Sequence, residues 1–141
     1  MANLKAKNEK LVSTKTTGYY GEKIAANYLK KHGLTLLDRN YLKNWGELDI
    51  VAKNKDRIHF VEVKTLSYET RELLEKAIFT KSWRPEEQVH HKKIHQISKA
   101  ITSWLSENSW EGDWQIDVIA IRLVYKEKYA TIKYINNVIL D

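Results

Sequence analysis

The chain has 141 residues, of which 43% are hydrophobic and 30% are charged, and it contains no cysteine. A chain of this length suits one domain that buries roughly 65 to 70% of its unfolded surface. The absence of cysteine excludes a disulfide framework and a thiolate metal site. The formal net charge of +6 favours a polyanionic partner, although charge by itself does not identify that partner.

No apolar run approaches the length of a membrane span. The first ten residues carry lysines but lack the apolar centre of a secretory signal. These features predict a cytoplasmic protein without a membrane partner.

The N-terminal part of the chain predicts an arm followed by a helix. Residues 1–17 lack apolar periodicity and are expected to form a flexible arm before a domain that covers residues 18–141. Thr17 is expected to cap a helix over residues 18–32. Gly33 follows that helix and suits the left-handed conformation that ends many helices.

Three strands are predicted next. Residues 34–40, 47–53 and 58–65 either alternate in polarity or run apolar at strand length. The turn-forming segments 44–46 and 54–57 separate them. Together they predict a three-stranded meander.

The C-terminal half predicts one long helix and two strands. Residues 66–85 favour no single assignment, whereas apolar positions at helical spacing predict an amphipathic helix from residue 86 to about residue 108. Residues 114–124 and 129–135 are predicted to be strands. The order α-β-β-β-α-β-β predicts an α/β fold in which helices flank a mixed sheet.

Four ionisable residues interrupt the apolar second and third strands: Glu47, Asp49, Glu62 and Lys64. If the hairpin between these strands is symmetric, the numbers of paired residues sum to 111, and Asp49 lies opposite Glu62. The same register places Glu47 opposite Lys64, so all four side chains share one face. Opposed β-carbons are about 4.5 to 5.5 Å apart, close enough for the two carboxylates to hold one divalent ion. Oxygen ligands favour magnesium or manganese over zinc.

This constellation suits phosphodiester hydrolysis, which requires an activated water and stabilisation of developing charge. A metal ion would polarise the phosphate, and Lys64, on the same face as Glu62, would orient the water or offset charge. The structural alternative is that Glu62 and Lys64 form an exposed pair on an edge strand.

Several short motifs resemble the YraN family of small bacterial proteins. They are Gly18, Gly21-Glu22, Arg39-Asn40-Tyr41, segments 46–50 and 60–65, and the closing segment 132–139. That family is similar to archaeal Holliday junction resolvases and to the wider restriction-endonuclease-like superfamily. The resemblance therefore implies a restriction-endonuclease-like fold and magnesium-dependent cleavage of DNA, including branched or flapped DNA.

The resemblance also implies roles for individual residues. Asp49 and Glu62 would be metal ligands, with the Val63 carbonyl as a further ligand. Lys64 would be the catalytic lysine, and Glu22 would be an acid that reaches the site from the first helix.

Some residues keep a second interpretation. Glu22 also suits the first turn of a helix, where the helix dipole favours a carboxylate. Glu47 is either a ligand to metal or water or the salt-bridge partner of Lys64. Asp117 interrupts an apolar strand, and a hydrogen-bonded structural acid is favoured over a residue of the cleft. Leu66 departs from the family pattern, in which arginine often follows the Lys-Thr pair.

Basic residues outside the acid cluster are candidates for contacts with the nucleic-acid backbone: Arg39, Arg84, Lys92 and Lys93. His91 and His95 have the spacing of a metal pair, but the pattern His-Glu-X-X-His is absent, which disfavours a zinc site. Trp45 and Trp83 are predicted in loops, either as core anchors or as rings that stack on exposed bases.

The sequence leaves two functions from different classes. One is a magnesium- or manganese-dependent endonuclease that acts on DNA, and the other is a nucleic-acid-binding module on the same fold without turnover. Resolution of a junction with two-fold symmetry would also require a homodimer.

Overall fold

The structure, a computed structural model, describes residues 14–80 and 91–138. Its elements in chain order are α2 (Thr14–Lys31), β1 (Thr35–Lys43), β2 (Gly46–Asn54), β3 (Arg57–Ser67), α3 (Arg71–Thr80), α4 (His91–Glu107), β4 (Asp113–Val124), the 3-10 helix η2 (Tyr125–Glu127) and β5 (Tyr129–Ile135). The predicted α/β class and the order of the predicted elements are confirmed. Helix α3 is an addition, and it forms in the segment 66–85 that the sequence left unassigned.

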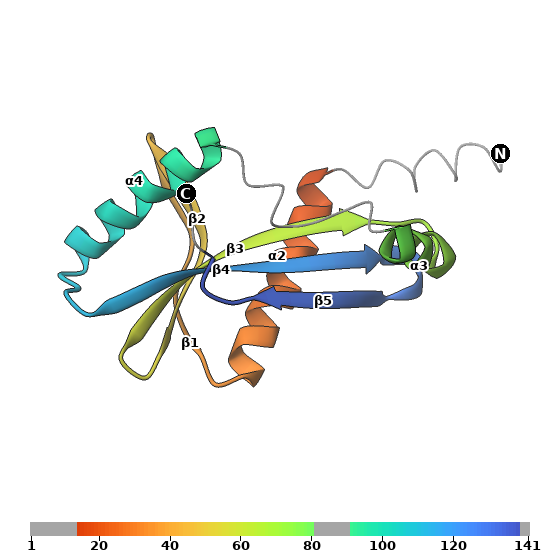
Figure 1. Ribbon diagram of the computed structural model, residues 1–141, viewed down its shortest axis with the longest axis horizontal. Coiled ribbons are helices and arrows are strands. Elements are labelled where there is room, and N and C mark those ends of the chain that lie inside the picture. The colour runs from red at the N-terminus through yellow and green to blue at the C-terminus, as the bar shows by residue number, and fades with distance from the viewer. Residues whose placement is uncertain (1–13, 81–90, 139–141) are drawn as a thin grey trace.

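The five strands form one mixed sheet in the order β1-β2-β3-β4-β5. Neighbouring strands are antiparallel except for β3 and β4, which are parallel. Parallel neighbours need a long crossover connection, and the segment that contains α3 and α4 provides it. Strand β3 is therefore an interior strand, paired on both sides (Figure 1).

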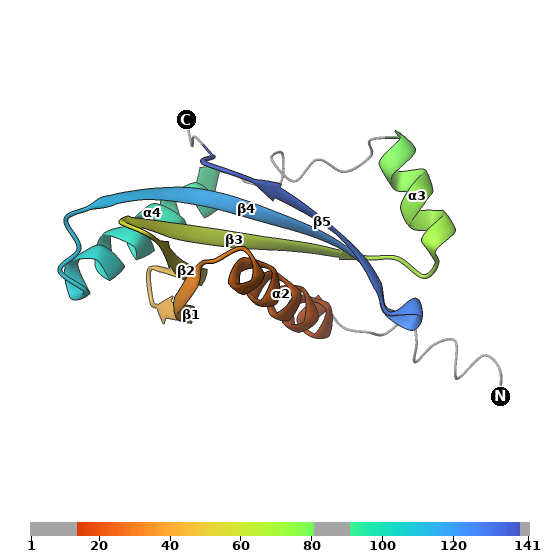
Figure 2. The same cartoon turned by 90° about the horizontal axis from the view of Figure 1, so that it is seen from below.

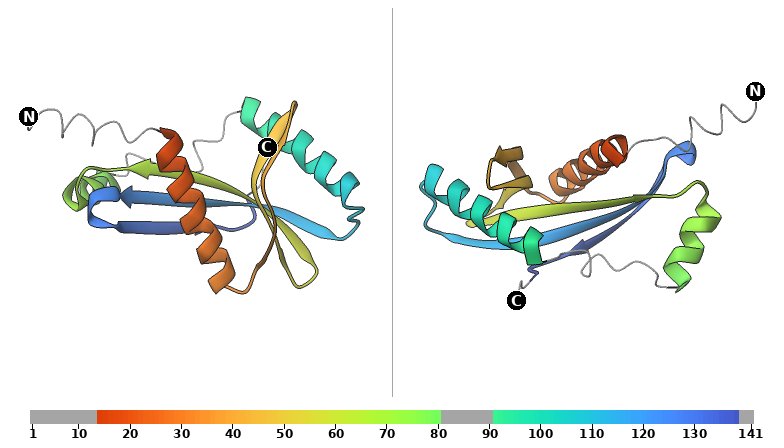
Figure 3. Two further views of the ribbon diagram at one scale, coloured as in Figure 1. Left: turned by 180° about the vertical axis from the view of Figure 1, so that it is seen from behind. Right: turned by 90° about the horizontal axis from the view of Figure 1, so that it is seen from above.

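Helices α2 and α4 cover opposite faces of the sheet, as Figure 3 shows. On the α2 face, buried alanines and a leucine of the helix pack on the strands: Ala25, Ala26 and Leu29 against Ile50, Val61, Ile119 and Ile121. On the α4 face, larger side chains form a second core: Ile97, Ile101 and Trp104 against Leu48, Ile58, Phe60 and Ile116. Helix α3 lies beyond the end of β3 (Figure 2).

Two glycines allow the helices to approach the sheet closely. A β-carbon on Gly21 of α2 would lie 1.8 Å from Oγ1 of Thr65 on β3. A β-carbon on Gly46, where β2 begins, would lie 2.2 Å from the main-chain oxygen of Gln96 on α4. Any larger residue would separate these elements, so both contacts fix the positions of α2 and α4.

The element boundaries differ in places from the prediction. Helix α2 begins at Thr14, so Thr17 is a buried residue inside the helix and does not cap it. The last four residues of the predicted arm, 14–17, are thus helical, whereas residues 1–13 lie outside the described part of the chain. Gly33 adopts the expected left-handed conformation, with φ 85°.

The long C-terminal helix is described from His91, and its predicted start at residue 86 falls outside the described residues. Across residues 14–80 and 91–138, no helix has both the length and the apolar character needed to cross a membrane.

Candidate functional site

The predicted register of β2 and β3 is confirmed near the hairpin turn, but the ladder ends before the predicted pairs Asp49–Glu62 and Glu47–Lys64. Pairs run from Asn54 opposite Arg57 to Ile50 opposite Val61, and in every pair the residue numbers sum to 111. Between Leu48 and Ile50, the regular alternation of side chains along β2 is interrupted. Leu48 packs in the core on the α4 face and Ile50 packs in the core on the α2 face, although residues two apart in a regular strand share a face. The strand therefore turns at Asp49.

The neighbouring strand turns at the same level. In β1, Asn40 lies between the pairs Arg39–Ile50 and Tyr41–Leu48, and its φ of 52° is in the left-handed region. Asparagine tolerates this conformation better than most residues. Because β1 and β2 remain paired on both sides of Asn40, the two strands turn together and leave the plane of β3 (Figure 1).

The Asp49 carboxylate contacts β3 just beyond the last pair of the β2–β3 ladder. Its Oδ2 accepts a hydrogen bond of 2.8 Å from the main-chain N–H of Val63. In an antiparallel ladder the N–H and C=O of one residue point to the same neighbouring strand, so the Val63 carbonyl points towards β2 as well. Val63 lies between Glu62 and Lys64, and Asp49 thus reaches the backbone at the centre of that motif.

Glu62 and Lys64 share one face of β3, because the pairing of β3 with β4 is unbroken from Arg57 to Ser67. Alternation places both on the α4 face, the side of Phe60. Glu62 is only 3% exposed and Lys64 is partly buried. The alternative of an exposed pair on an edge strand is therefore wrong.

Glu22 of α2 lies near the same acids. Burial raises the pKa of its carboxyl above the usual range, and the negative charges of Asp49 and Glu47 raise it further. The positive charge of Arg39 and a hydrogen bond with the Asn40 side chain act in the opposite direction. A helix and the β1–β2 hairpin thus bring three carboxylates into electrostatic contact.

The acids approach from two sides. Glu22 belongs to the helix on the α2 face, whereas Glu62 and Lys64 lie on the α4 face, and Asp49 lies at the strand turn between them. The single face expected from a regular hairpin does not form, because the paired part of β2 and β3 ends at Ile50 and Val61. Glu47 lies beyond the turn and is exposed.

Within the part of the chain that the structure describes, no three side chains of His, Cys, Asp or Glu gather as a metal-binding group. The residues that could offer oxygen ligands here are Asp49, which accepts the hydrogen bond from the Val63 N–H, Glu62, which precedes Val63 in the chain, and Val63 itself through its carbonyl. Two carboxylates and water molecules are sufficient for magnesium, which keeps part of its hydration shell in proteins.

Other predicted residues take varied positions. Arg39 is exposed and interacts with Glu22. Arg84 and Trp83 lie outside the described residues, as do the side chains of Lys92, Lys93 and His91 in the first turn of α4. His95 is exposed. Trp45 is 45% exposed, and its Nε1 donates a hydrogen bond of 2.7 Å to Ser103 of α4.

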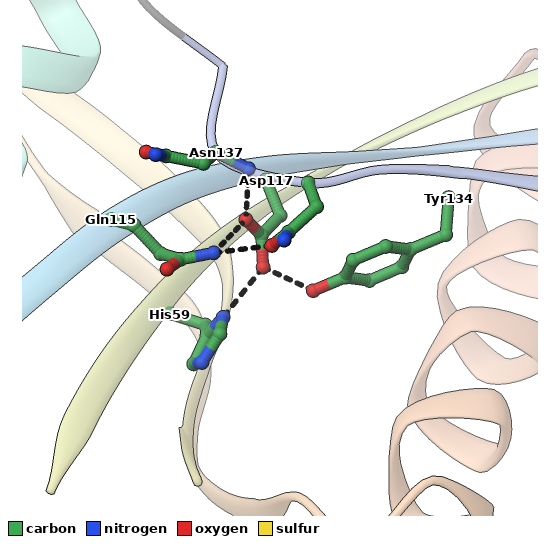
Figure 4. Close-up of polar contacts among 6 residues, drawn as sticks. His59, Gln115, Asp117, Tyr134 and Asn137 are labelled. Carbon is green, nitrogen blue, oxygen red and sulfur yellow. Dashed lines mark hydrogen bonds and ion pairs between the residues drawn. The ribbon is translucent and has the colours of Figure 1, made fainter.

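Asp117 is the fully buried centre of a separate polar network, drawn in Figure 4. Its Oδ2 lies 2.6 Å from Nδ1 of His59 and accepts a hydrogen bond from the Tyr134 hydroxyl. Its Oδ1 accepts bonds of 2.7 Å from Nε2 of Gln115 and 2.8 Å from the N–H of Asn137. The structural role predicted for Asp117 is confirmed.

This network lies on the face of the sheet opposite Glu62. Asp117 pairs with Val61, which packs against α2, whereas Glu62 points to the α4 face. Sequence reasoning did not identify His59 as a partner, because only the parallel pairing of β3 with β4 brings it close to Asp117. A histidine within the apolar run from Ile58 to Val61 was the available signal.

These features define an α/β protein with a mixed sheet and a group of carboxylates beside the interior strand β3. The model of "Uncharacterised protein family UPF0102" matches residues 21–121, so the chain belongs to the UPF0102 family, for which YraN is an equivalent name. The matched region contains Glu22, Asp49, Glu62 and Lys64.

Relatives in this family match most of the chain. A UPF0102 protein of Clostridium acetobutylicum is 37% identical over 124 residues, which cover 87% of this chain and 93% of the relative. A UPF0102 protein of Campylobacter fetus is 33% identical over 121 residues, which cover 86% of this chain and 91% of the relative. Both alignments span nearly the full length of the relatives.

Proposed function

We propose that this protein is a metal-dependent endonuclease that hydrolyses phosphodiester bonds in DNA. The observation that carries the proposal is the hydrogen bond of Asp49 to the Val63 N–H, which holds one acid against the backbone between Glu62 and Lys64. Burial of charged groups is costly unless opposite charge or hydrogen bonds compensate. Two carboxylates and a lysine beside an interior strand are hard to explain as packing and are well suited to phosphate chemistry.

The donor set fits magnesium or manganese. Asp49 and Glu62 offer carboxylate oxygens, and the Val63 carbonyl points towards β2, the strand that carries Asp49. Burial is the main cause of the raised pKa of Glu22, and the negative charges of Asp49 and Glu47 raise it further; a divalent cation would relieve this second contribution. When bound, such an ion would polarise the phosphate and lower the pKa of a coordinated water molecule.

Two further side chains have proposed chemical roles. The Lys64 ammonium, two residues from Glu62 on the same face, would orient the attacking water or offset negative charge on the phosphoryl oxygens. Glu22 holds a proton more readily than an ordinary glutamate, which suits a group that transfers protons during the reaction.

The rival function is a nucleic-acid-binding module without turnover. One observation favours it: among residues 14–80 and 91–138, no three acids or histidines converge as a metal-binding group. Both functions predict that this basic protein binds DNA, so a binding measurement alone does not distinguish them.

The test is a cleavage screen of branched, flapped, single-stranded and duplex DNA with magnesium or manganese. We expect Asp49→Asn and Glu62→Gln to abolish cleavage while DNA binding in chelator stays the same or tightens, because each change removes a negative charge. The amide introduced by Asp49→Asn keeps a side-chain oxygen that can accept the bond from the Val63 N–H, so the fold is preserved. Lys64→Ala should stop cleavage and weaken binding only modestly.

Asp113→Asn is the matched control. Its side chain is 79% exposed at the start of β4, so the variant should cleave like the wild-type protein. If the wild-type protein cleaves none of the substrates, or if Glu62→Gln cleaves equally well, the endonuclease proposal fails and the binding module replaces it.

A further inference from the structure

Three tyrosines form a continuous row of rings beside the candidate site. The rings of Tyr19 and Tyr20 are 5.5 Å apart and meet edge to face at 77°, and those of Tyr20 and Tyr125 are 5.3 Å apart at 56°. Tyr19 is 60% exposed and Tyr125 is 44% exposed, whereas Tyr20 packs partly against the core on the α2 face. Tyr20 therefore supports two rings whose surfaces remain accessible.

The row is held in place by more than ring contacts. A hydrogen bond between the hydroxyl groups of Tyr20 and Tyr125 is the largest cause of the raised pKa of Tyr20. Tyr125 begins η2, where Glu127 accepts a hydrogen bond of 3.0 Å from the N–H of Arg71. Both ends of the row thus rest on well-connected elements, which lowers the entropy lost when a ligand stacks on the rings.

One end of the row adjoins the acid cluster. Tyr19 and Glu22 are three residues apart on α2, so their β-carbons are about 5 to 6 Å apart on one side of the helix. Gly21 lies against Thr65, the residue that follows Lys64. Tyr19 therefore lies one helical turn from Glu22, the acid that α2 contributes to the site.

Exposed lysines accompany the rings. Lys23 follows Tyr19 by one helical turn, and Lys126 and Lys128 follow Tyr125 in sequence. Aromatic rings that alternate with cations suit single-stranded nucleic acid, because bases stack on the rings and lysines contact the phosphates. Paired bases in a continuous duplex keep their faces hidden within the stack and offer none to a tyrosine.

We propose that Tyr19 and Tyr125, supported by Tyr20, form a stacking surface for unpaired bases of a DNA strand that leads into the carboxylate site. The inference rests on the proposed function only for its link to cleavage. It identifies the substrate class as DNA with a single-stranded segment, such as a flap. Binding by the stacking surface itself does not depend on turnover.

The test measures binding of the full-length chain in chelator to a single-stranded oligonucleotide that contains 2-aminopurine and to a blunt duplex. We expect Tyr19→Leu and Tyr125→Leu each to weaken binding to the single strand by about 5- to 100-fold, with little effect on the duplex. Quenching of 2-aminopurine by stacking should fall in both variants. Tyr19→Phe keeps the ring and is the matched control, and its affinity should stay within about twofold of the wild-type value.

If both leucine variants are folded and bind the single strand as tightly as the wild-type protein, the stacking surface is overturned. The two proposals fail separately. A wild-type protein that stacks bases but cleaves no substrate would overturn only the endonuclease, and one that cleaves while the leucine variants bind normally would overturn only the stacking surface.

Discussion

At the scale of single residues, the sheet holds acids in two different electrostatic environments. Asp117 is fully buried, and both of its carboxylate oxygens accept hydrogen bonds from neighbouring side chains and from a main-chain N–H. Glu22, by contrast, lies near Asp49 and Glu47, and its pKa is raised. The hydrogen bonds around Asp117 stabilise the fold. The negative charges around Glu22 repel one another, and a bound cation would remove that repulsion.

The raised pKa of Glu22 has a consequence for stability. A carboxyl whose pKa is higher in the folded state must ionise against a penalty, so this group lowers stability as pH rises above the usual glutamate range, about 4.3. In chelator at pH 7, Glu22→Gln should therefore have a higher Tm than the wild-type protein, and the difference should shrink as pH falls towards about 4. Thermal melts at both pH values measure it. An equal gain at both pH values would show that the effect is not electrostatic.

The Asp117 network predicts that a small substitution at its centre causes a large loss of stability. Asp117→Asn places an amide group, itself a donor, among the donors of His59, Gln115 and Tyr134. We expect the free energy of unfolding to fall by about 2 to 4 kcal/mol, measured by chemical denaturation. Asp113→Asn, at an exposed position of the same strand, should change it by less than about 0.5 kcal/mol. Similar values for the two variants would contradict the structural role of Asp117.

At the scale of elements, the site depends on two placements. The turn at Asn40 and Asp49 opens the sheet between β2 and β3, and the contact between Gly21 and Thr65 sets helix α2 against the opened edge. Neither strand alone produces the acid cluster, because Glu22 comes from the helix.

The contact at Gly21 predicts a different result for each of two glycines in one helix. Gly21→Ala forces a methyl group into Thr65, so the free energy of unfolding should fall by about 1 to 3 kcal/mol. At Gly18 the added carbon meets no atom within 4 Å among the described residues, apart from its chain neighbours and the backbone of its own helix, and Gly18→Ala should stabilise the helix by up to about 1 kcal/mol. Chemical denaturation of both variants tests the contact, and equal effects would argue against close packing of α2 on β3.

At the scale of the whole molecule, the net charge of +6 governs encounter with a polyanion. Each phosphate contact should add about 0.9 to the slope of log affinity against log salt on duplex DNA, so binding should weaken steeply between about 50 and 200 mM salt. Fluorescence anisotropy in chelator over this range gives the slope. An affinity that does not change with salt would contradict binding through the basic surface.

The sequence by itself determined the elements and the local register. Hydrophobic periodicity located the strands to within a few residues, because each strand buries apolar side chains at period two or as a continuous run. Hairpin symmetry gave the pairing of β2 with β3, because the short turn fixes which residues face each other. The same register directed attention to Asp49, Glu62 and Lys64.

Only the tertiary structure decided how these residues are arranged. The turn at Asp49 depends on the backbone of Asn40 in a neighbouring strand, and the pairing of β3 with β4 joins residues that are more than fifty positions apart. Long-range contacts of this kind leave no periodic signal. The bond between His59 and Asp117 was therefore not predicted, and the approach of Glu22 to the site was expected only from the family resemblance. The packing of two helices on opposite faces of one twisted sheet brings such residues together, because each helix must bury its own apolar side.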